Sequence, residues 1–290
     1  MLMEGGTLIT VEEAERRVLV LENPGIRGRA QIAQILYAGL QLVLPGEIAP
    51  SHRHVASALR FIVEGSGACT AVDGERVDME PGDFVITPSW AFHDHGNAGE
   101  EPVVWLDGLD VPIVNAFDAS FAERYREPVQ PIAFGPGYSA LRYGHGLLPF
   151  EHDRKGKSSP LFHYPYEHSR AALEGLPRRG ELNSFARHQA SVYEFSQRAG
   201  AGSDDGAFLQ WLPKQFRGRD HRSTDATVFN VVEGSGRSVI DGEVFESREK
   251  DVFIVPSWSS VRHESDGVLV LFSFSDRPAQ QAFGIWREGA

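Results

Sequence analysis

Cysteine is almost absent from this chain: Cys69 is the single example among 290 residues. No disulfide can therefore form within one chain, which is typical of proteins from a reducing compartment. The first fifteen residues are acidic and contain no basic region followed by an apolar stretch, so we expect no secretory signal. We accordingly predict a cytoplasmic protein.

Long hydrophobic runs and basic clusters are missing as well. The longest apolar stretches, residues 35–44 and 268–274, have the length of a strand and are too short to cross a bilayer. The chain carries 28 Lys and Arg against 40 Asp and Glu, a formal charge of −12, and offers no basic stripe to neutralise phosphates. We therefore expect neither a membrane nor a nucleic acid as partner. With 41% hydrophobic residues the chain can bury a sizeable core, and its length suggests about two domains.

Turn residues, in contrast, are abundant. The 30 glycines and 17 prolines separate short runs rich in Val, Ile, Phe and Leu, which is the pattern of an all-β sandwich or barrel. Two motifs occur twice in the same order: FIVEGSG at 61–67 recurs as NVVEGSG at 230–236, and DFVITPSW at 83–90 recurs as DVFIVPSW at 251–258. Because chance rarely repeats two motifs in register, we predict two copies of one small antiparallel β unit.

The repeated pattern predicts particular elements. In both copies, EGSG and PSW are expected to form tight turns. Capping and helical spacing favour helices over 10–17, 116–125 and 167–176. The expected strands are 40–44, 61–63, 84–87 and 103–106 in the first copy, and 228–232, 253–255 and 268–274 in the second.

Four of the 11 histidines cluster at two places in the first copy. His52 and His54 flank Arg53, and His93 and His95 follow the PSW turn with the same spacing. Residues two apart on a strand point to the same face, so each pair can direct both imidazoles into a barrel. A lone buried histidine is usually a core residue, whereas two such pairs around one hairpin favour a metal site.

This arrangement resembles the paired signature of the cupin superfamily. The matching positions are Gly46, HRH at 52–54, Gly82, PSW at 88–90, His93 and Asn97. The resemblance implies two double-stranded β-helix barrels, a mainly all-β bicupin with a few helices, and the metal ligands His52, His54 and His93. The usual signature also has a glutamate ligand four or five residues after the second histidine. Ala58 and Leu59 stand there in this chain, so the carboxylate ligand is missing.

A three-histidine centre in a two-cupin chain resembles the gentisate 1,2-dioxygenase family, which includes salicylate and 1-hydroxy-2-naphthoate dioxygenases. The matching segments are HRHVASALRF at 52–61, HDHGN at 93–97, WLDGLD at 105–110, RYGHGLLP at 142–149, RSTD at 222–225 and FSFSDRP at 272–278. Members of the family usually carry further residues at the N-terminus. The resemblance implies one Fe(II) per chain, a small aromatic acid and dioxygen as reactants, and a homotetramer.

The chemistry of such a centre follows from its charge. Three neutral imidazoles leave a divalent ion its full charge and up to three open positions. An ortho-hydroxy aromatic acid can chelate the ion through its carboxylate and phenolate oxygens, and dioxygen can take the third position. The better-known oxygenase centre of two histidines and one carboxylate differs by just this charge. Zinc, copper and nickel also suit three imidazoles, so the residues leave the metal open.

The resemblance also implies roles for residues around the metal. Arg60 matches an arginine that faces the substrate carboxylate, a role that suits a planar guanidinium, and a surface strand charge is the alternative. His95 matches a residue that bonds substrate or oxygen as acid or base, or else supports His93. Asp107 matches a pocket carboxylate that orients His95 or a ring hydroxyl.

Three further residues are implied at the substrate. Arg16 supplies another carboxylate contact, although the sequence does not separate it from Arg17. Tyr37 and Gly39 line the slot for the aromatic ring. Many relatives have tryptophan at the position of Tyr37, so ring-size preference can differ here.

The second copy does not keep the ligands. Register places His221, Ser223 and Val261 at the positions of the three ligand histidines, and His263 at that of His95. A single imidazole does not hold a divalent ion firmly, so we expect a structural domain. The predicted organisation is an N-terminal arm over 1–31, a metal-binding cupin over 32–115, a helical and loop connection over 116–190, and a degenerate cupin over 191–290.

We therefore predict an iron(II)-dependent dioxygenase that cleaves the ring of an ortho-hydroxy aromatic acid, with gentisate converted to maleylpyruvate as the first choice. Salicylate, a substituted salicylate and 1-hydroxy-2-naphthoate are alternative substrates for the same site. A non-catalytic bicupin that binds a small molecule is the alternative from another class. The intact three-histidine set, together with Arg60 and Asp107, argues against it.

Overall fold

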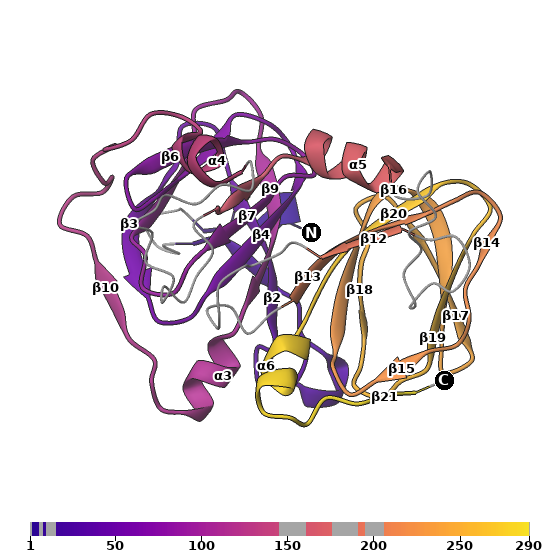
Figure 1. Cartoon of the computed structure of the whole chain (residues 1–290). Coiled ribbons are helices and arrows are strands. Elements are labelled where there is room, and N and C mark those ends of the chain that lie inside the picture. The colour runs from indigo at the N-terminus through magenta and orange to yellow at the C-terminus, as the bar shows by residue number, and fades with distance from the viewer. Residues whose placement is uncertain are drawn as a thin grey trace. The chain divides into compact units, whose positions relative to one another are not determined.

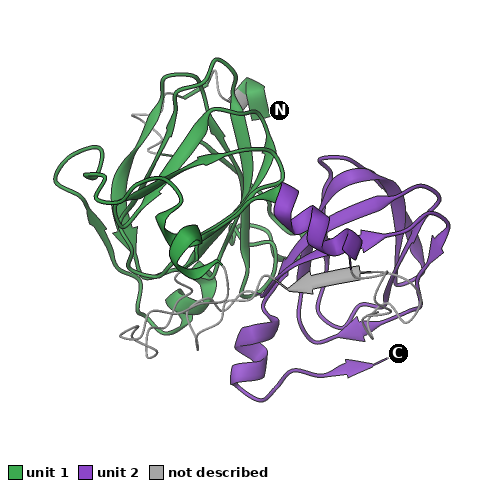
Figure 2. Cartoon of the chain, turned by 45° about the horizontal axis from the view of Figure 1, so that its top comes forward, with its two compact units in different colours: residues 1–166, 197–203 green, residues 167–196, 204–290 purple. Residues whose placement is uncertain are grey.

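A computed structural model describes residues 2–5, 8–9, 16–144, 161–175, 191–194 and 206–289 of the chain (Figure 1). It contains two compact units, Met1–Tyr166 with Gln197–Ser203, and Glu167–Ser196 with Asp204–Ala290 (Figure 2). Of the predicted connection 116–190, the described residues 116–144 and 161–166 fall in the first unit and residues 167–175 in the second. Each unit is described by itself below.

The first unit is built from two antiparallel sheets. The six-stranded sheet has the order β1 (Val18–Val20), β2 (Tyr37–Val43), β9 (Val103–Leu109), β4 (Ala58–Glu64), β7 (Phe84–Thr87) and β11 (His163–Tyr164). The five-stranded sheet has the order β10 (Ala122–Arg124), β3 (Ile48–His54), β8 (His93–Asn97), β5 (Ala68–Val72) and β6 (Glu75–Met79). The helices of this unit are α1 (Leu2–Gly5), η1 (Pro24–Ile26), α3 (Val111–Ala116) and α4 (Tyr138–Tyr143).

The second unit repeats this architecture around one long strand, β16 (Thr227–Ile240). Its main sheet has the order β12 (Ser191–Glu194), β13 (Gly206–Leu212), β20 (Leu269–Ser275), β16, β19 (Val261–Ser265) and β14 (Phe216–Arg217). The strands β17 (Glu243–Arg248) and β18 (Val252–Val255) also pair with β16. The remaining elements are the pair β15 (Arg222–Ser223) and β21 (Glu288–Gly289), and the helices α5 (Tyr166–Gly175) and α6 (Arg277–Ala282).

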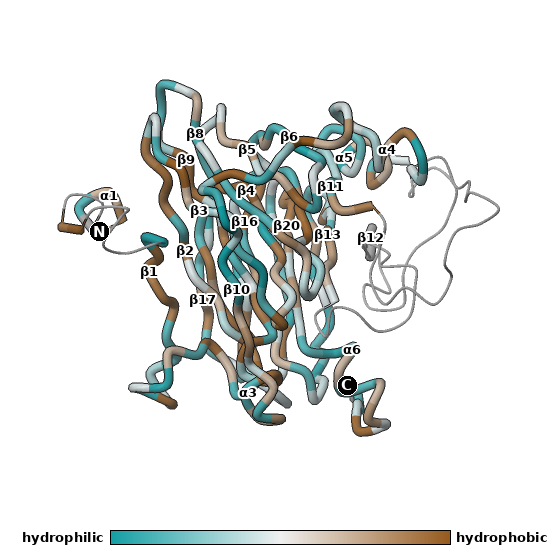
Figure 3. Tube along the Cα trace, turned by 90° about the vertical axis from the view of Figure 1, so that its left-hand side faces the viewer, coloured by the Kyte–Doolittle hydropathy of each residue, from teal (hydrophilic) through white to brown (hydrophobic). Residues whose placement is uncertain are grey.

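Hydrophobic strands supply the core of each unit, as the brown segments in Figure 3 show. In the first unit the largest fully buried side chains are aromatic, and Trp105, Phe61 and Phe84 are at most 1% exposed. In the second, seven buried apolar residues form one cluster: Leu212, Phe216, Phe229, Val231, Val255, Leu269 and Leu271. Burial of these side chains is the main favourable contribution to folding.

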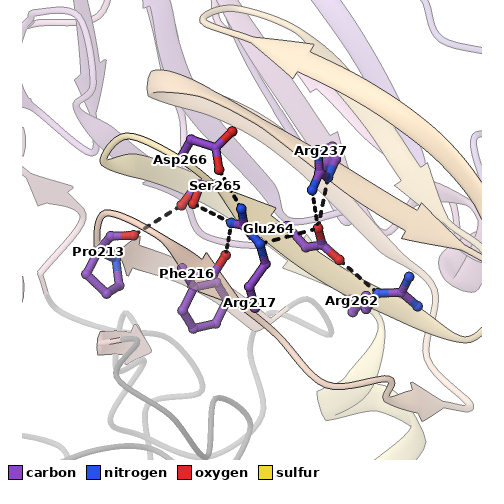
Figure 4. A network of polar contacts seen from close by, with 8 residues as sticks. All are labelled: Pro213, Phe216, Arg217, Arg237, Arg262, Glu264, Ser265 and Asp266. Atoms are coloured by element: carbon purple, nitrogen blue, oxygen red, sulfur yellow. Dashed lines mark hydrogen bonds and ion pairs between the residues drawn. The ribbon is translucent and has the colours of Figure 1, made fainter.

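A polar network joins three strands of the second unit (Figure 4). Glu264 of β19 accepts hydrogen bonds from Arg237 of β16 at 2.8 Å and from Arg262 at 3.0 Å. Arg217 of β14 lies 3.9 Å from the same carboxylate and donates to Asp266. Because several charges share one carboxylate, the network holds neighbouring strands more firmly than an isolated surface pair would.

Matched hydrogen bonds confirm that the two units are copies of one design. The Trp90 N–H donates to the His54 carbonyl at 2.8 Å, and the Trp258 N–H donates to the Ser223 carbonyl at 2.7 Å. Both tryptophans have a φ of 65°, a left-handed value that non-glycine residues rarely adopt. The PSW turns are therefore confirmed in both copies.

The predicted strands are confirmed in both units, and the predicted helix over 167–176 is present as α5. The predicted helix over 116–125 is wrong, because α3 ends at Ala116, Asp118 has a φ of 53°, and β10 follows at 122–124. The backbone of β10 pairs with the edge of β3, whereas an isolated exposed helix of ten residues is only marginally stable in water. The predicted helix over 10–17 lies mostly outside the described residues.

The EGSG segment forms a turn only in the first copy. There β4 ends at Glu64 and β5 begins at Ala68. In the second copy the same letters lie inside the continuous strand β16, so the predicted turn is wrong. Strand β16 has a β-bulge, seen as a register shift between Val231 and Glu233, where the first copy ends one strand and starts another. Gly234 has a positive φ, as Gly65 has in the first copy. Within the described residues, no helix is both long and apolar enough to cross a membrane.

Candidate metal centre

Two neighbouring strands of the first unit place the four clustered histidines. His52 on β3 pairs directly with His93 on β8, and Ala49 pairs with His95. The register shifts between these two pairs, so Pro50 and Ser51 bulge out of the ladder ahead of His52. Alternation along each strand then directs both histidines of a pair to the same face.

His52, His54 and His93 converge. Their ring centroids are 4.3 Å apart for His52 and His93, 4.9 Å for His54 and His93, and 5.3 Å for His52 and His54. One ring nitrogen from each lies within 4.8 Å of the other two, and no second metal-binding group of this kind occurs in the described part of the chain. Three imidazoles at this spacing can hold one divalent transition-metal ion.

Backbone carbonyls orient the three rings. The Nδ1 atoms lie at the carbonyl oxygens of Pro50 (3.1 Å), Ala56 (2.6 Å) and Ala91 (3.0 Å), respectively. An Nδ1–H that donates to a carbonyl leaves Nε2 as the free lone pair, which is how metal-binding histidines are usually fixed. The donor set therefore fits a metal ion.

The same rings are neutral at physiological pH. Burial, followed by the charge of Arg16, lowers the pKa of His52 to about 4. Burial also lowers the pKa of His54, and it lowers that of His93 well below the ordinary value, with Arg60 adding to the effect. Neutral imidazoles are the form that binds a metal, so no proton has to leave before an ion enters.

Arg60 is buried on the six-stranded sheet and is 4% exposed, which excludes a surface strand charge. Its Nε lies 3.4 Å from Asp107 Oδ1, and its Nη1 donates to Thr87 Oγ1. Asp107 also accepts a hydrogen bond from the Trp105 indole at 3.1 Å. Burial raises the pKa of Asp107 to about 6, and the nearby Arg60 opposes that rise. At neutral pH the carboxylate is therefore mostly ionised and balances Arg60.

His95 is 1% exposed, and its ring lies 5.6 Å from that of His93 and 5.5 Å from that of Trp105. Neither of its ring nitrogens has a hydrogen-bond partner within the described residues. Buried polar atoms are nearly always paired, so these nitrogens suit a ligand in the barrel. The structure pairs Asp107 with Arg60 and Trp105, and not with His95.

The structure separates Arg16 from Arg17. Arg17 is buried and forms an ion pair with Glu47, which also accepts from the Leu44 N–H at 2.7 Å. Arg16 instead reaches the metal centre, where its Nη2 lies 2.7 Å from His52 Nδ1 and donates to the Pro50 carbonyl at 3.1 Å. Arg16 and the Pro50 carbonyl thus compete for one nitrogen of His52, because a guanidinium needs the unprotonated Nδ1 as acceptor and the carbonyl needs Nδ1–H as donor.

Tyr37 and Gly39 lie on β2 beside the same region. Gly39 pairs with Asp107 across the sheet, and Arg60 pairs with Asp107 from the other side. A Cβ at Gly39 would press on Val18 and on the Tyr37 hydroxyl, so glycine is needed for the present position of the tyrosine ring. Burial raises the pKa of Tyr37 to about 12, which keeps its hydroxyl protonated.

The second unit reproduces the frame of this centre without its ligands. His221 and Val261 form a bridge that matches the pairing of His52 with His93, which confirms the predicted register. Phe229 belongs to the apolar core cluster, and Phe229 and Phe253 surround the ring of His263 at 4.9 and 6.3 Å. An apolar interior replaces the polar one.

Three residues near the centre were not identified from the sequence. Thr87 binds Arg60 and Trp105 binds Asp107, as described above. Arg53, between two ligand histidines in the sequence, lies over the rings of Trp90 and Phe92. Trp105 belongs to a segment used for the resemblance, and Thr87 lies within the repeated segment at 83–90, so position alone could have drawn attention to them.

Two copies of one antiparallel unit, with a three-histidine centre in the first, define a bicupin. The model of the cupin domain family matches residues 39–110. Gentisate 1,2-dioxygenase 1 from Aquipseudomonas alcaligenes is 54% identical over 99% of this chain and 83% of its own length. A gentisate 1,2-dioxygenase from a Streptomyces species is 36% identical over 97% of this chain and 81% of its own length.

A solved structure agrees with these relatives. The salicylate 1,2-dioxygenase from Pseudoaminobacter salicylatoxidans, in adducts with gentisate, superposes with a TM-score of 0.93 at 32% identity, covering 99% of this chain and 81% of that one. The chain belongs to the gentisate 1,2-dioxygenase family of ring-cleaving dioxygenases.

Proposed function

We propose that this chain is an iron(II)-dependent dioxygenase that cleaves the ring of an ortho-hydroxy aromatic acid, with gentisate as the substrate and maleylpyruvate as the product. The observation that carries the proposal is the buried Arg60 guanidinium in the same barrel as three convergent neutral histidines. Asp107 balances the charge of Arg60 alone, and a divalent cation in the same barrel would add positive charge that calls for a further anion. A substrate carboxylate would be that anion.

His52, His54 and His93 would hold the iron through Nε2, since their Nδ1 atoms lie at backbone carbonyls. When bound, iron(II) supplies a Lewis acid for the substrate oxygens and the electrons that activate dioxygen. Trp105, fully buried beside His95 and Asp107, would keep bulk water from that side of the reacting groups.

Arg60 would bind the substrate carboxylate with two N–H groups, held in place by Asp107 and Thr87. Arg16 would join it. If Nε2 of His52 held the metal, Nδ1 would carry the proton and donate to the Pro50 carbonyl, and the Arg16 guanidinium could then turn from His52 to the substrate carboxylate.

His95 would exchange the proton of the reaction. Burial and the charges of Arg60 and Arg16 lower its pKa well below the ordinary value, so the ring is neutral, with one nitrogen that donates and one that accepts. Both nitrogens are available to substrate or oxygen. Tyr37 and Gly39 would form the slot for the ring.

Gentisate is favoured over salicylate because the relative at 54% identity is named a gentisate 1,2-dioxygenase. Salicylate is the second candidate, because the superposing structure is a salicylate 1,2-dioxygenase that also holds gentisate. Dioxygen as co-substrate, one iron per chain, a homotetramer and a cytoplasmic location complete the proposal.

Oxygen uptake by iron-loaded protein tests this function. The panel is gentisate, salicylate, 5-aminosalicylate and 1-hydroxy-2-naphthoate, with benzoate as the control that lacks the ortho-hydroxyl. We expect the highest kcat/KM with gentisate, no uptake with benzoate, and both atoms of isotopically labelled dioxygen in the ring-opened product. Binding of the acids without oxygen uptake would instead support the non-catalytic bicupin.

A further inference from the structure

Arg53 lies between two ligand histidines on β3 and points to the opposite face of the strand from both of them. Its side chain is 28% exposed and therefore well covered for an arginine. None of the roles proposed for metal or substrate binding involves Arg53. Its contacts nevertheless connect β3, which carries His52 and His54, with the residues just before His93.

The guanidinium of Arg53 is held on three sides. Its Nε and Nη2 both donate to Glu123 Oε2, at 2.9 and 2.6 Å. The central carbon lies 4.6 Å from the centre of the Trp90 ring and 4.5 Å from that of the Phe92 ring. A guanidinium held by a carboxylate and two aromatic faces has little rotational freedom.

The three partners belong to two segments next to the metal centre, β10 and the residues that lead into β8. Glu123 lies on β10, which pairs with β3 in register, so that Glu123 is opposite Arg53. The Trp90 N–H donates to the carbonyl of His54 at 2.8 Å. Phe92 directly precedes His93, and its ring packs edge-on against Tyr125 at 4.9 Å.

We infer that Arg53 is a positioning residue of the metal centre: it ties the strand that carries His52 and His54 to the segment that carries His93. The inference rests on the proposed metal site. If Arg53 is removed, β3 and the start of β8 keep their backbone pairing, but the side-chain contact that fixes their separation on the outer face is lost. The three imidazoles then lose part of their preorganisation, which weakens metal binding.

The second unit contains a natural control. Arg222 follows His221 as Arg53 follows His52, and its guanidinium lies over the Trp258 ring at 5.9 Å. The two other partners are missing, because Gly289 pairs opposite Arg222 and Ser260 stands where register places Phe92. Arg222 therefore shares the strand position and the aromatic face with Arg53, in a unit without the ligand set.

The experiment measures Co²⁺ binding to metal-free protein from its visible absorption, in competition with a chelator, and thermal unfolding of the same samples. We expect Arg53→Ala to bind Co²⁺ about 10–100-fold more weakly than wild type, the usual effect of removing a residue that orients metal ligands. Arg53→Lys should bind with intermediate affinity, because it keeps the charge near Glu123 but not the planar stack. Arg222→Ala should bind Co²⁺ like wild type.

Three further variants keep the test decisive. If Arg53→Ala does not fold, Glu123→Gln and Phe92→Leu each remove one contact, and each should weaken Co²⁺ binding less than Arg53→Ala is expected to. His54→Ala reports on the metal site itself: unchanged Co²⁺ binding by that variant would remove the proposed site and this inference with it. If His54→Ala loses Co²⁺ while Arg53→Ala, or both partner variants, keep wild-type affinity and absorption, the metal site stands and the role of Arg53 is refuted.

Discussion

At the level of single residues, the pairing of Arg60 with Asp107 sets the charge of the substrate region. Both side chains are at most 7% exposed, and each balances the other's charge in a site where burial disfavours ions. Under the proposed function, an incoming carboxylate would meet a guanidinium that is already held in place, which is how a chain of net charge −12 could bind an anion.

Arg60→Ala should keep the metal and lose activity. We expect a fall in kcat/KM of roughly tenfold to more than a hundredfold, because one charge-assisted contact contributes about 1.5–3 kcal/mol. Arg60→Lys should recover part of the loss, since a point charge cannot replace two parallel N–H donors. Steady-state oxygen uptake with samples matched for metal content measures the effect.

Two controls accompany this test. Arg76→Ala removes an exposed arginine and should leave kcat/KM unchanged. The double variant Arg60→Ala with Asp107→Asn removes the buried unpaired carboxylate that the single variant leaves. If Arg60→Ala kept the wild-type kcat/KM with both gentisate and salicylate, Arg60 would not bind the substrate carboxylate, and Arg16 would be the residue that does.

Asp276 gives the second unit a pH-dependent stability. Burial raises the pKa of Asp276 in the folded chain to about 6, from 3.8 for an exposed aspartate. Between these values the unfolded chain releases the proton while the folded chain retains it, so stability falls as pH rises from about 4 to 6. The shift corresponds to about 3 kcal/mol. Asp276→Asn should lack this loss, so its stability relative to wild type should rise by about that amount between pH 4 and 7.

Denaturant unfolding at several pH values, followed by fluorescence, measures this difference. The asparagine oxygen can still accept from the Ala226 N–H, as Asp276 does at 2.8 Å, but the hydrogen bond from the Gln280 amide to the other carboxylate oxygen at 3.0 Å is lost. That loss is the same at every pH, so the change of the stability difference with pH reports the charge. Parallel stability curves for variant and wild type would show that Asp276 titrates normally in the folded chain.

At the level of elements, Gln130 ties the loop after β10 to β8, the strand that carries His93. The Gln130 N–H donates to Asp94 at 3.0 Å, and its amide donates to the carbonyls of Ala71 and Phe92 at 3.0 and 3.1 Å. Its amide oxygen accepts from the Gly74 N–H at 2.7 Å. The buried Gln130 side chain thus provides hydrogen-bond partners for three backbone groups: the Gly74 N–H and the carbonyls of Ala71 and Phe92.

Gln130→Ala should lower the free energy of unfolding by about 3 kcal/mol, because each buried backbone group left without a partner costs roughly 1–3 kcal/mol and water restores some of them. Gln34→Ala, at an exposed glutamine, should change it by less than about 0.5 kcal/mol. Urea unfolding of both variants gives the comparison. Equal stabilities of the two would mean that Gln130 is replaced by solvent without cost.

At the level of the whole molecule, the two copies have diverged in their interiors. The first keeps convergent imidazoles and a buried ion pair, and the second has filled the equivalent space with Phe229 and Phe253 around His263. The shared turns and strand pairings show that this change did not require a new backbone. The metal site is thus an addition to a frame that folds around apolar side chains.

This arrangement predicts one metal ion per chain. His54→Ala and His93→Ala should each lose it while the circular dichroism spectrum stays that of a β protein. His221→Ala, at the one ligand position that the second unit keeps, should retain the wild-type metal content. Metal analysis of reconstituted protein decides, and a second ion that survives His54→Ala would place a site outside the first unit.

Much of the fold was predictable from local pattern and repetition. Short apolar runs between glycines and prolines identify strands, because strand formation depends on alternation and turn chemistry within a few residues. The predicted helix over 116–125 failed because β10 is stabilised by the edge of β3, and helical spacing contains no information about that distant partner. The EGSG turn of the second copy failed for the same reason, since neighbouring strands continue the ladder along β16.

The chain alone predicts the two copies, the spacing of His52, His54 and His93, and the loss of ligands in the second copy, because two-residue alternation and register are properties of the chain. Only the fold establishes which of Arg16 and Arg17 reaches the centre, which side chain balances Arg60, and what holds Arg53. Those pairings join residues tens of positions apart, and only the packing of separate strands brings their charges within a few ångströms.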